Sequence, residues 1–276
     1  MCGIIYARTK GAASVIASRY ELQRTRGTEG FGYATIGNSV MIKKAQGEKE
    51  IKRELKKEKA RAILFHHRYP TSTPNFIEAA HPIEVRSPLL SSVYHVVHNG
   101  VITNDDAMKK KHEAMGFAYR TIIKTLYETI GQNYELNQYN DSEALAIEAA
   151  LCIEGKQAAI EANGSTAFIA LETIKGKPIA LHYGRNNGNP LIETITEYSH
   201  ILASQGTGDE IAANVLHRYE YATGKIIKCP VQIGAPLPVP MGYAHESYED
   251  HKDDDYLDLV SEREYYRDQL KIAEVQ

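Results

Sequence analysis

The chain has 276 residues, of which 43% are hydrophobic and 24% are charged, and its formal net charge at pH 7 is -3. Such a composition is ordinary for a globular protein, and the length allows a sizeable buried core. The small net charge gives no electrostatic footprint for nucleic acid. No apolar run reaches the roughly 18 to 20 residues of a membrane-spanning helix. We therefore expect neither nucleic acid nor a membrane among the partners.

Strand-like and helix-like segments alternate along most of the chain. Runs rich in β-branched and aromatic residues predict strands, at residues 3–6, 32–36, 40–45, 62–66, 94–98, 167–172, 178–183 and 200–203. Helical patterns predict helices, at residues 13–24, 50–59, 120–130 and 142–153. The pattern predicts an α+β protein with much antiparallel sheet.

The composition changes after residue 230. Prolines gather at 236–240, an acidic run follows at 249–255, and helical spacing of apolar residues appears at about 256–275. We predict a catalytic domain at residues 1–230 and a proline-containing, acidic, partly helical tail at 231–276. The apolar stripe of the tail fits docking on the protein's own core and docking on another subunit equally well.

The cysteines and histidines show no metal-binding or disulfide pattern. Cys2, Cys152 and Cys229 are odd in number and widely spaced, so neither a disulfide framework nor zinc spacing is visible. The eleven histidines form no His-x-x-x-His or Cys/His motif, and no P-loop is present. We predict no metal and no cofactor. A reactive thiol needs a reducing compartment and no secretory signal is visible, so the cytoplasm is the expected location.

Cys2 stands directly behind Met1. Removal of Met1 would place a thiol and a free α-amine on one residue. Because an α-amine titrates near pH 7.7 to 8.0 and a thiol near 8.5, roughly, the amine can take the thiol proton near neutrality. The alternative is a buried, inert cysteine at the start of an inner strand, since free cysteine is often buried.

Three further polar groups end or follow apolar runs: Arg68, the pair Asn99–Gly100, and Asp141. A guanidinium binds carboxylates, an amide with a backbone N–H binds an oxyanion, and a carboxylate binds an ammonium group. Together these groups fit free glutamine. Each has an alternative: Arg68 as a surface arginine, Asn99–Gly100 as a two-residue hairpin turn, and Asp141 as a helix N-cap.

The motifs occur in the order found in a known family. They are Cys2-Gly3-Ile4, Arg26-Gly27 with Gly32, His67 to Thr71, Ala80-His81-Pro82, His98 to Asn104, Asp141-Ser142-Glu143 and Gly164-Ser165, with a weaker echo at Gly188-Asn189-Pro190. With its motifs in this order, the chain resembles the glutaminase domain of class II glutamine amidotransferases, which are N-terminal nucleophile hydrolases. It is most similar to the glutaminase domain of glucosamine-6-phosphate synthase. The resemblance implies a four-layer αββα sandwich.

The resemblance also implies a catalytic set. Cys2 attacks the side-chain amide of glutamine to form a γ-glutamyl thioester, with its own α-amine as general base. The Asn99 amide and the Gly100 N–H hold the tetrahedral oxyanion.

The same resemblance implies a set of substrate-binding residues. Arg68 binds the α-carboxylate, Asp141 binds the α-ammonium group, and Tyr69 and Thr71 line the pocket. The loop after Arg68 departs from the family, because Tyr69 stands where tryptophan or phenylalanine is common. We expect this departure to affect glutamine affinity more than the class of reaction.

The ammonia acceptor is not expected on this chain, because no second catalytic domain is recognisable after residue 230. Three hypotheses follow. The chain is a glutaminase that supplies a separate synthase, a stand-alone hydrolase of glutamine or a γ-glutamyl compound, or a non-catalytic binding or assembly protein if Met1 is retained. A homo-oligomer formed through the tail is a further possibility.

Overall fold

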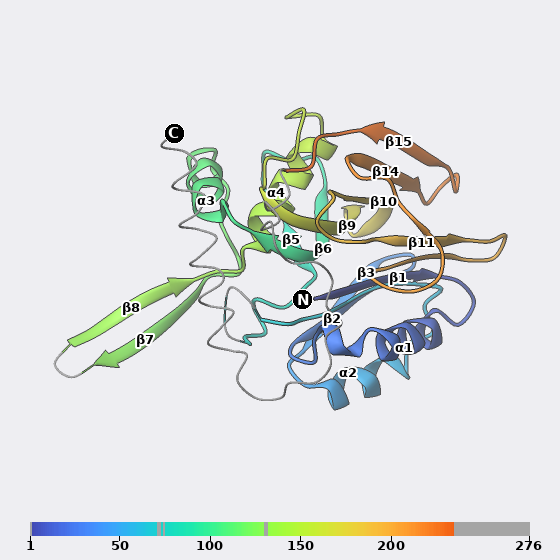
Figure 1. Ribbon diagram of the computed structural model, residues 1–276, viewed down its shortest axis with the longest axis horizontal. Coiled ribbons are helices and arrows are strands. Elements are labelled where there is room, and N and C mark those ends of the chain that lie inside the picture. Colours follow the sequence, from blue (N-terminus) through green and yellow to red (C-terminus); the bar gives the residue numbers. More distant parts are fainter. Residues whose placement is uncertain (1, 71–72, 74, 130–131, 235–276) are drawn as a thin grey trace, which may run out of the picture.

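The computed structural model describes residues 2–70, 73, 75–129 and 132–234. Two antiparallel sheets are stacked between two layers of helices (Figure 1). Helices α1 (Ala12–Leu22) and α2 (Glu48–Leu55) cover one sheet, while α3 (Asp105–Ala114) and α4 (Ser142–Ile153) lie on the side of the other. This arrangement confirms the predicted αββα sandwich. The predicted helical tail, from residue 235 on, lies outside the described residues.

The first sheet, sheet A, contains seven strands in the described part of the chain, in the order β13-β11-β12-β1-β4-β2-β3. All neighbouring strands in it are antiparallel. Its strands are β1 (Gly3–Arg8), β2 (Phe31–Ile36), β3 (Val40–Ala45), β4 (Ala62–His67), β11 (Ile192–Ile195), β12 (His200–Ala203) and β13 (Asp209–Glu210).

The second sheet, sheet B, contains six strands within the described residues, in the order β15-β14-β10-β9-β6-β5. These pairs are antiparallel as well. Its strands are β5 (Ile83–Val85), β6 (Val93–Ile102), β9 (Gly164–Ile174), β10 (Lys177–Arg185), β14 (Val215–Glu220) and β15 (Ile226–Pro230). A short 3-10 turn, Arg24–Arg26, follows α1.

Side-chain alternation along the strands separates three apolar cores. On β1, Ile4 and Tyr6 pack between the two sheets, whereas Ile5 and Ala7 pack under α1 and α2. The third core lies between sheet B and α4, whose residues are almost all buried. Because successive strand residues point to opposite faces, each sheet contributes one side of its strands to the core between the sheets, where His66 of β4 also contacts the His98 carbonyl oxygen of β6.

The predicted helix at 120–130 is wrong. The structure has the strand β7 (Ile123–Thr129) there, paired with β8 (Gln132–Gln138) in a separate hairpin that projects from the body of the molecule (Figure 1). The segment opens with the β-branched residues Thr121, Ile122 and Ile123, which lower helix propensity and favour strands. Helix α3 was not predicted from the sequence.

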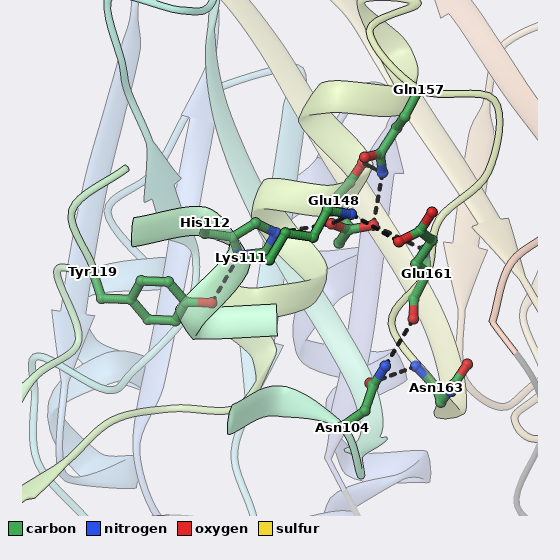
Figure 2. Close-up of polar contacts among 8 residues, drawn as sticks. All are labelled: Asn104, Lys111, His112, Tyr119, Glu148, Gln157, Glu161 and Asn163. Atoms are coloured by element: carbon green, nitrogen blue, oxygen red, sulfur yellow. Dashed lines mark hydrogen bonds and ion pairs between the residues drawn. The ribbon is translucent and has the colours of Figure 1, made fainter. Parts of the chain in front are cut away.

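A buried polar cluster ties α3 and the loop after α4 to α4 itself (Figure 2). At its centre, the fully buried Glu148 carboxylate accepts hydrogen bonds from His112 Nε2 at 2.8 Å, Lys111 Nζ at 3.0 Å, Gln157 Nε2 at 2.7 Å and the Glu161 N–H at 2.9 Å. Burial acts to raise the pKa of Glu148, but these hydrogen bonds outweigh it and hold the pKa at about 2.

Two further contacts at the edge of this cluster involve Tyr119, which follows α3, and Glu161, which follows α4. Tyr119 Oη lies 2.9 Å from His112 Nδ1, and Lys111 Nζ is 2.8 Å from Glu161 Oε2. We call Lys111, His112, Tyr119, Glu148, Gln157 and Glu161 the Glu148 cluster. It fixes α4, whose first turn follows Asp141.

None of the helices in the described residues is both long enough and apolar enough to cross a membrane.

Candidate active site

Cys2 lies just before β1, half-buried, against the backbone that follows β4. Its Sγ is 3.4 Å from the Tyr69 N–H, which donates to it, and 3.5 Å from the Tyr69 carbonyl oxygen. Burial raises the pKa of the Cys2 thiol, although the Tyr69 hydrogen bond and the charge of Arg68 act in the opposite direction. The thiol is therefore protonated at neutral pH, and its activation requires a base.

Asn99 and Arg26 meet at the Cys2 backbone. Arg26 Nε donates to the Cys2 carbonyl oxygen at 3.0 Å. In the amide orientation that satisfies both partners, Asn99 Nδ2 donates to the same carbonyl at 2.7 Å and Asn99 Oδ1 accepts from Arg26 Nη2 at 3.0 Å. Asn99 is fully buried, and Asn189 Nδ2 donates to its backbone oxygen at 3.1 Å. The amide is thus held beside the cysteine from two sides.

Sequence reasoning gave no role to Arg26 and Asn189. Both stand in motifs that the sequence displays, Arg26-Gly27 and Gly188-Asn189-Pro190. Their contacts join residues 24 and 90 positions apart along the chain. Only the folded arrangement brings them to the cysteine and to Asn99, so the motifs were visible but their function was not.

Asn99 and Gly100 lie within β6, where they pair with Ala167 and Thr166 of β9, so the alternative of a hairpin turn is wrong. Gly100 has φ +153°, and a Cβ at this position would lie 1.8 Å from the Ser165 carbonyl oxygen and 2.7 Å from His98 Nε2. Glycine is required because the neighbouring strand approaches too closely for any side chain.

Arg68 and Asp141 are each only 2% exposed, which rules out a surface arginine. Arg68 Nη2 donates to the Thr73 carbonyl oxygen at 2.8 Å and to the Thr73 hydroxyl. Asp141 occupies the N-cap position of α4 but makes no side-chain capping bond; its Oδ2 instead accepts the Ile102 N–H at 2.8 Å. The N-cap alternative is therefore wrong for its side chain.

The charges of Arg68 and Asp141 both affect the pKa of the Cys2 thiol. Against the larger effect of burial, which raises the pKa of Cys2, the charge of Arg68 acts to lower it, while Asp141 adds to the increase. Burial lowers the pKa of Arg68, and the charges of Cys2 and Asp141 act against that decrease. The structure therefore brings together Cys2, Asn99, Arg68 and Asp141, with the Tyr69 backbone against the sulfur. Thr71, also predicted to line the pocket, lies outside the described residues.

Buried histidines surround this site. His66 Nε2 lies 3.2 Å from the His98 carbonyl oxygen, and the rings of His66 and His81 have centroids 3.9 Å apart. Burial lowers the pKa of His67 and of His98 to about 4, so these rings are neutral at pH 7. Within the described residues, His66 Nδ1, His67 Nε2 and both ring nitrogens of His81 lack a hydrogen-bond partner. No group of three metal-ligating side chains occurs in the part of the chain that the structure describes.

A groove of about 680 Å³ lies elsewhere, between α1 and α2. Its lining includes Ile51 and Leu55 of α2 and Phe65 of β4, which belong to the core that α1 and α2 share with sheet A. Cys2 is not among its lining residues, and the lining contains no nucleophilic thiol beside an amide or guanidinium. The groove therefore does not belong to the thiol site.

No protein-family model matches the sequence, and no curated protein matches it significantly. Solved structures do share its fold. A glutamine phosphoribosylpyrophosphate amidotransferase from B. subtilis matches with a TM-score of 0.57 and 18% identity, over 83% of this chain and 49% of its own. The allosteric regulatory enzyme of purine biosynthesis matches with a TM-score of 0.56 and 19% identity, over the same shares. This chain spans about half the length of these two proteins. At these identities the likeness shows that this chain shares the fold of the two enzymes.

Proposed function

We propose that this protein releases ammonia from the side-chain amide of glutamine, with Cys2 as the nucleophile. The observation that carries this proposal is the convergence of four groups. The Asn99 amide is hydrogen-bonded to the Cys2 backbone, and the charges of Arg68 and Asp141 act on the Cys2 thiol. Glutamine presents an amide, a carboxylate and an ammonium group, so each of its polar ends has a complementary partner.

The reaction begins with a proton transfer. Once Met1 is removed, the α-amine of Cys2 takes the thiol proton, directly or through a water molecule. The sulfur attacks the amide carbon, and the developing oxyanion is bound by the Asn99 amide and the Gly100 N–H. Asn99 Nδ2 has two hydrogens, of which one bonds to the Cys2 carbonyl oxygen. Ammonia leaves, and water then hydrolyses the γ-glutamyl thioester.

Arg26 acts as a positioning residue in this scheme. Its guanidinium is bonded to the Cys2 carbonyl oxygen and to the Asn99 amide oxygen, so it fixes both the nucleophile's backbone and the orientation of the oxyanion donor. A buried donor held in advance stabilises developing charge without the cost of reorganisation during the reaction.

Arg68 and Asp141 bind the amino-acid end of glutamine. The guanidinium of Arg68 pairs with the α-carboxylate as a planar fork, and Asp141 accepts from the α-ammonium group. Tyr69 lines the same pocket in this proposal. The proposed partner is an ammonia-consuming synthase on a separate chain. The proposed compartment for this thiol chemistry is the cytoplasm.

The test combines chemical labelling with a matched variant. Intact-mass analysis first identifies protein that lacks Met1, and this material is treated with 6-diazo-5-oxo-L-norleucine, an electrophilic glutamine analogue. We expect this reagent to label Cys2 alone. With glutamine as the substrate, the unlabelled protein should produce glutamate and ammonia. The Cys2→Ala variant should have no turnover, while the control Cys152→Ala should keep full turnover. Labelling of Cys152 or Cys229 in place of Cys2 would overturn the assignment.

A further inference from the structure

Asn140 is a buried residue directly before Asp141, and hydrogen bonds tie it to segments that are distant in the sequence. It is 2% exposed. Its Nδ2 donates to the Ala79 carbonyl oxygen at 2.7 Å, and its Oδ1 accepts the Ser142 N–H at 3.0 Å. Its own N–H donates to Thr121 Oγ1 at 3.0 Å. Both ends of the side-chain amide are therefore bonded, which fixes its orientation.

The bond to Ala79 connects Asn140 with the segment that holds Arg68. Arg68 Nη2 donates to the carbonyl oxygen of Thr73 at 2.8 Å and also to its hydroxyl. Thr73 and Ala79 belong to the same connection between β4 and β5, and both are buried. The Asn140 amide therefore joins the connection that binds the Arg68 guanidinium to the residue beside Asp141.

The other side of Asn140 is held by a carboxylate at the start of α4. Buried Glu143 accepts the Thr121 N–H at 2.9 Å, the Thr121 hydroxyl at 2.6 Å and the Arg120 N–H at 2.7 Å. The Thr121 hydroxyl thus donates to Glu143 and accepts from the Asn140 N–H, the two roles open to a hydroxyl. A buried network in which each member is bonded is rigid, and this one joins residues on both sides of Asp141 in the sequence.

We propose that Asn140 is a positioning residue that sets the separation between Arg68 and Asp141. The inference rests on the proposed glutamine chemistry and deepens it, because it assigns the spacing of the amino-acid site to one amide. The α-carboxylate and the α-ammonium group of glutamine are attached to the same carbon, so their two partners must lie at a fixed separation. Asn140 acts on the substrate only through these two groups.

Asn140→Ser isolates the bond to Ala79. A serine hydroxyl still accepts the N–H two residues on, at Ser142, as asparagine does, but it is too short to reach the Ala79 carbonyl oxygen. The connection that holds Arg68 then loses its tie to Asp141. Because a misplacement of about 1 Å can cost about a hundredfold, we expect the KM for glutamine to rise about tenfold to a hundredfold, with a smaller change in kcat.

Asn140→Asp keeps the shape of the side chain and gives a second readout. Its carboxyl keeps the acceptor for Ser142, but only the protonated form can donate to the Ala79 carbonyl oxygen. Burial and the carboxylates of Asp141 and Glu143 act to raise the pKa of the new group. We expect the KM of this variant, relative to that of the wild type, to increase as the pH rises through that pKa.

Asn104→Ser is the matched control. Asn104 makes the same two kinds of bond, because its Nδ2 donates to the Glu161 carbonyl oxygen at 3.0 Å and its Oδ1 accepts the Asn163 N–H at 2.8 Å (Figure 2). These bonds join the start of α3 to the segment before β9 and do not involve Arg68 or Asp141. The KM for glutamine should therefore stay that of the wild type.

Labelling of Cys2 by two reagents separates substrate positioning from stability. Iodoacetamide reports the reactivity of the thiol alone, whereas 6-diazo-5-oxo-L-norleucine also carries the amino-acid end of glutamine. For Asn140→Ser, we expect the analogue concentration that gives half-maximal labelling to rise about as much as KM, while the iodoacetamide rate at Cys2 stays that of the wild type. Peptide mapping locates each label, and a urea titration measures the stability of each variant.

The outcomes distinguish this inference from the proposed function. A wild type that hydrolyses glutamine, together with an unchanged KM in Asn140→Ser, would reject the positioning role and leave the function standing. Equal slowing of both reagents in that variant would show that Asn140 acts on the fold alone. If Asn140→Ser does not fold, a relative KM of Asn140→Asp that is constant with pH rejects the role. A wild type that neither hydrolyses glutamine nor is labelled by the analogue would overturn both proposals.

Discussion

Two buried polar regions border α4, and they are satisfied to different degrees. Around Glu148, the carboxylate accepts four hydrogen bonds from side chains and backbone. Around Cys2, by contrast, one ring nitrogen of His66, one of His67 and both of His81 have no hydrogen-bond partner in the described structure. Buried polar groups are normally paired, and a group without a partner needs an explanation. We expect the region around Glu148 to stabilise the fold, and the incompletely paired region is where the proposed substrate site lies.

The largest effect is expected from Asn99→Asp, which tests the polar region around Cys2. Aspartate keeps the shape of the side chain and an acceptor for Arg26 but removes both N–H donors. We expect kcat for glutamine hydrolysis to fall about 100- to 1,000-fold, the usual result of removing one oxyanion donor. Steady-state kinetics and a urea titration give the two readouts. Loss of the folded state without a kinetic defect in the remaining folded protein would assign Asn99 a purely structural role.

Arg68→Lys should have the next largest effect. Lysine keeps the charge but loses the planar fork that pairs with a carboxylate. Hydrogen bonds to charged groups contribute roughly 1.5 to 3 kcal/mol, so we expect the KM for glutamine to rise about tenfold to a hundredfold with a smaller change in kcat. The matched control is Arg24→Lys, an exposed arginine paired with Glu48. Equal KM values in the wild type and Arg68→Lys would contradict the proposed role of Arg68 in substrate binding.

Glu148→Gln tests the saturated region and should leave KM and kcat unchanged. Loss of the charge weakens the bonds from His112 and Lys111, so we expect the free energy of unfolding to fall by about 1 to 3 kcal/mol. The pKa of Glu148 is about 2 in the folded protein and about 4.3 in an unfolded chain. Its stabilisation is therefore fully present above about pH 5 and is lost as the pH falls from about 4.5 to about 2.

Urea titrations across this pH range supply the check on Glu148. The difference in stability between wild type and Glu148→Gln should shrink toward acid, because protonation makes the wild-type carboxyl neutral as well. A difference that stays constant from neutral pH to pH 3 would contradict the assignment of charge-dependent stabilisation to this carboxylate.

Tyr119→Phe should have the smallest effect. It removes one hydroxyl from the edge of the Glu148 cluster, 2.9 Å from His112 Nδ1. A single hydrogen bond contributes about 0.5 to 1.5 kcal/mol, and the aromatic packing of the ring is kept. A thermal unfolding experiment measures the change. An effect as large as that of Glu148→Gln would show that the cluster depends on its edge as much as on its centre.

Sequence patterns predicted much of the β framework and part of the helical framework. The predicted strands at 40–45 and 200–203 and the helix at 142–153 coincide with β3, β12 and α4, because each has a strong local signal. Asn99–Gly100 has the local sequence signal of a hairpin turn, the alternative that the structure rules out, because glycine at position 100 is required by the close approach of the neighbouring strand. The helix expected at 120–130 failed because β-branched residues outweighed the apolar spacing.

The site could be predicted only in part. Cys2, Asn99, Arg68 and Asp141 were visible as motifs, and the fold brings them together. The support given by Arg26 and Asn189, and the whole Glu148 cluster, depend on contacts between distant segments: Lys111 and His112 reach Glu148 across 37 and 36 positions. Such pairs leave no periodic trace in one sequence, so physical reasoning from local patterns cannot find them.

The position of Asn99 and Gly100 in β6 has a consequence for dynamics. This strand is hydrogen-bonded to β5 and β9 and is flanked by two apolar cores. Amide protons in such strands exchange with solvent mainly through global unfolding. Hydrogen exchange in β6 should therefore be among the slowest in the described residues, with or without glutamine. The proposed oxyanion donors then lie on a strand that is held on both sides, so we expect any adjustment on substrate binding to occur in other segments.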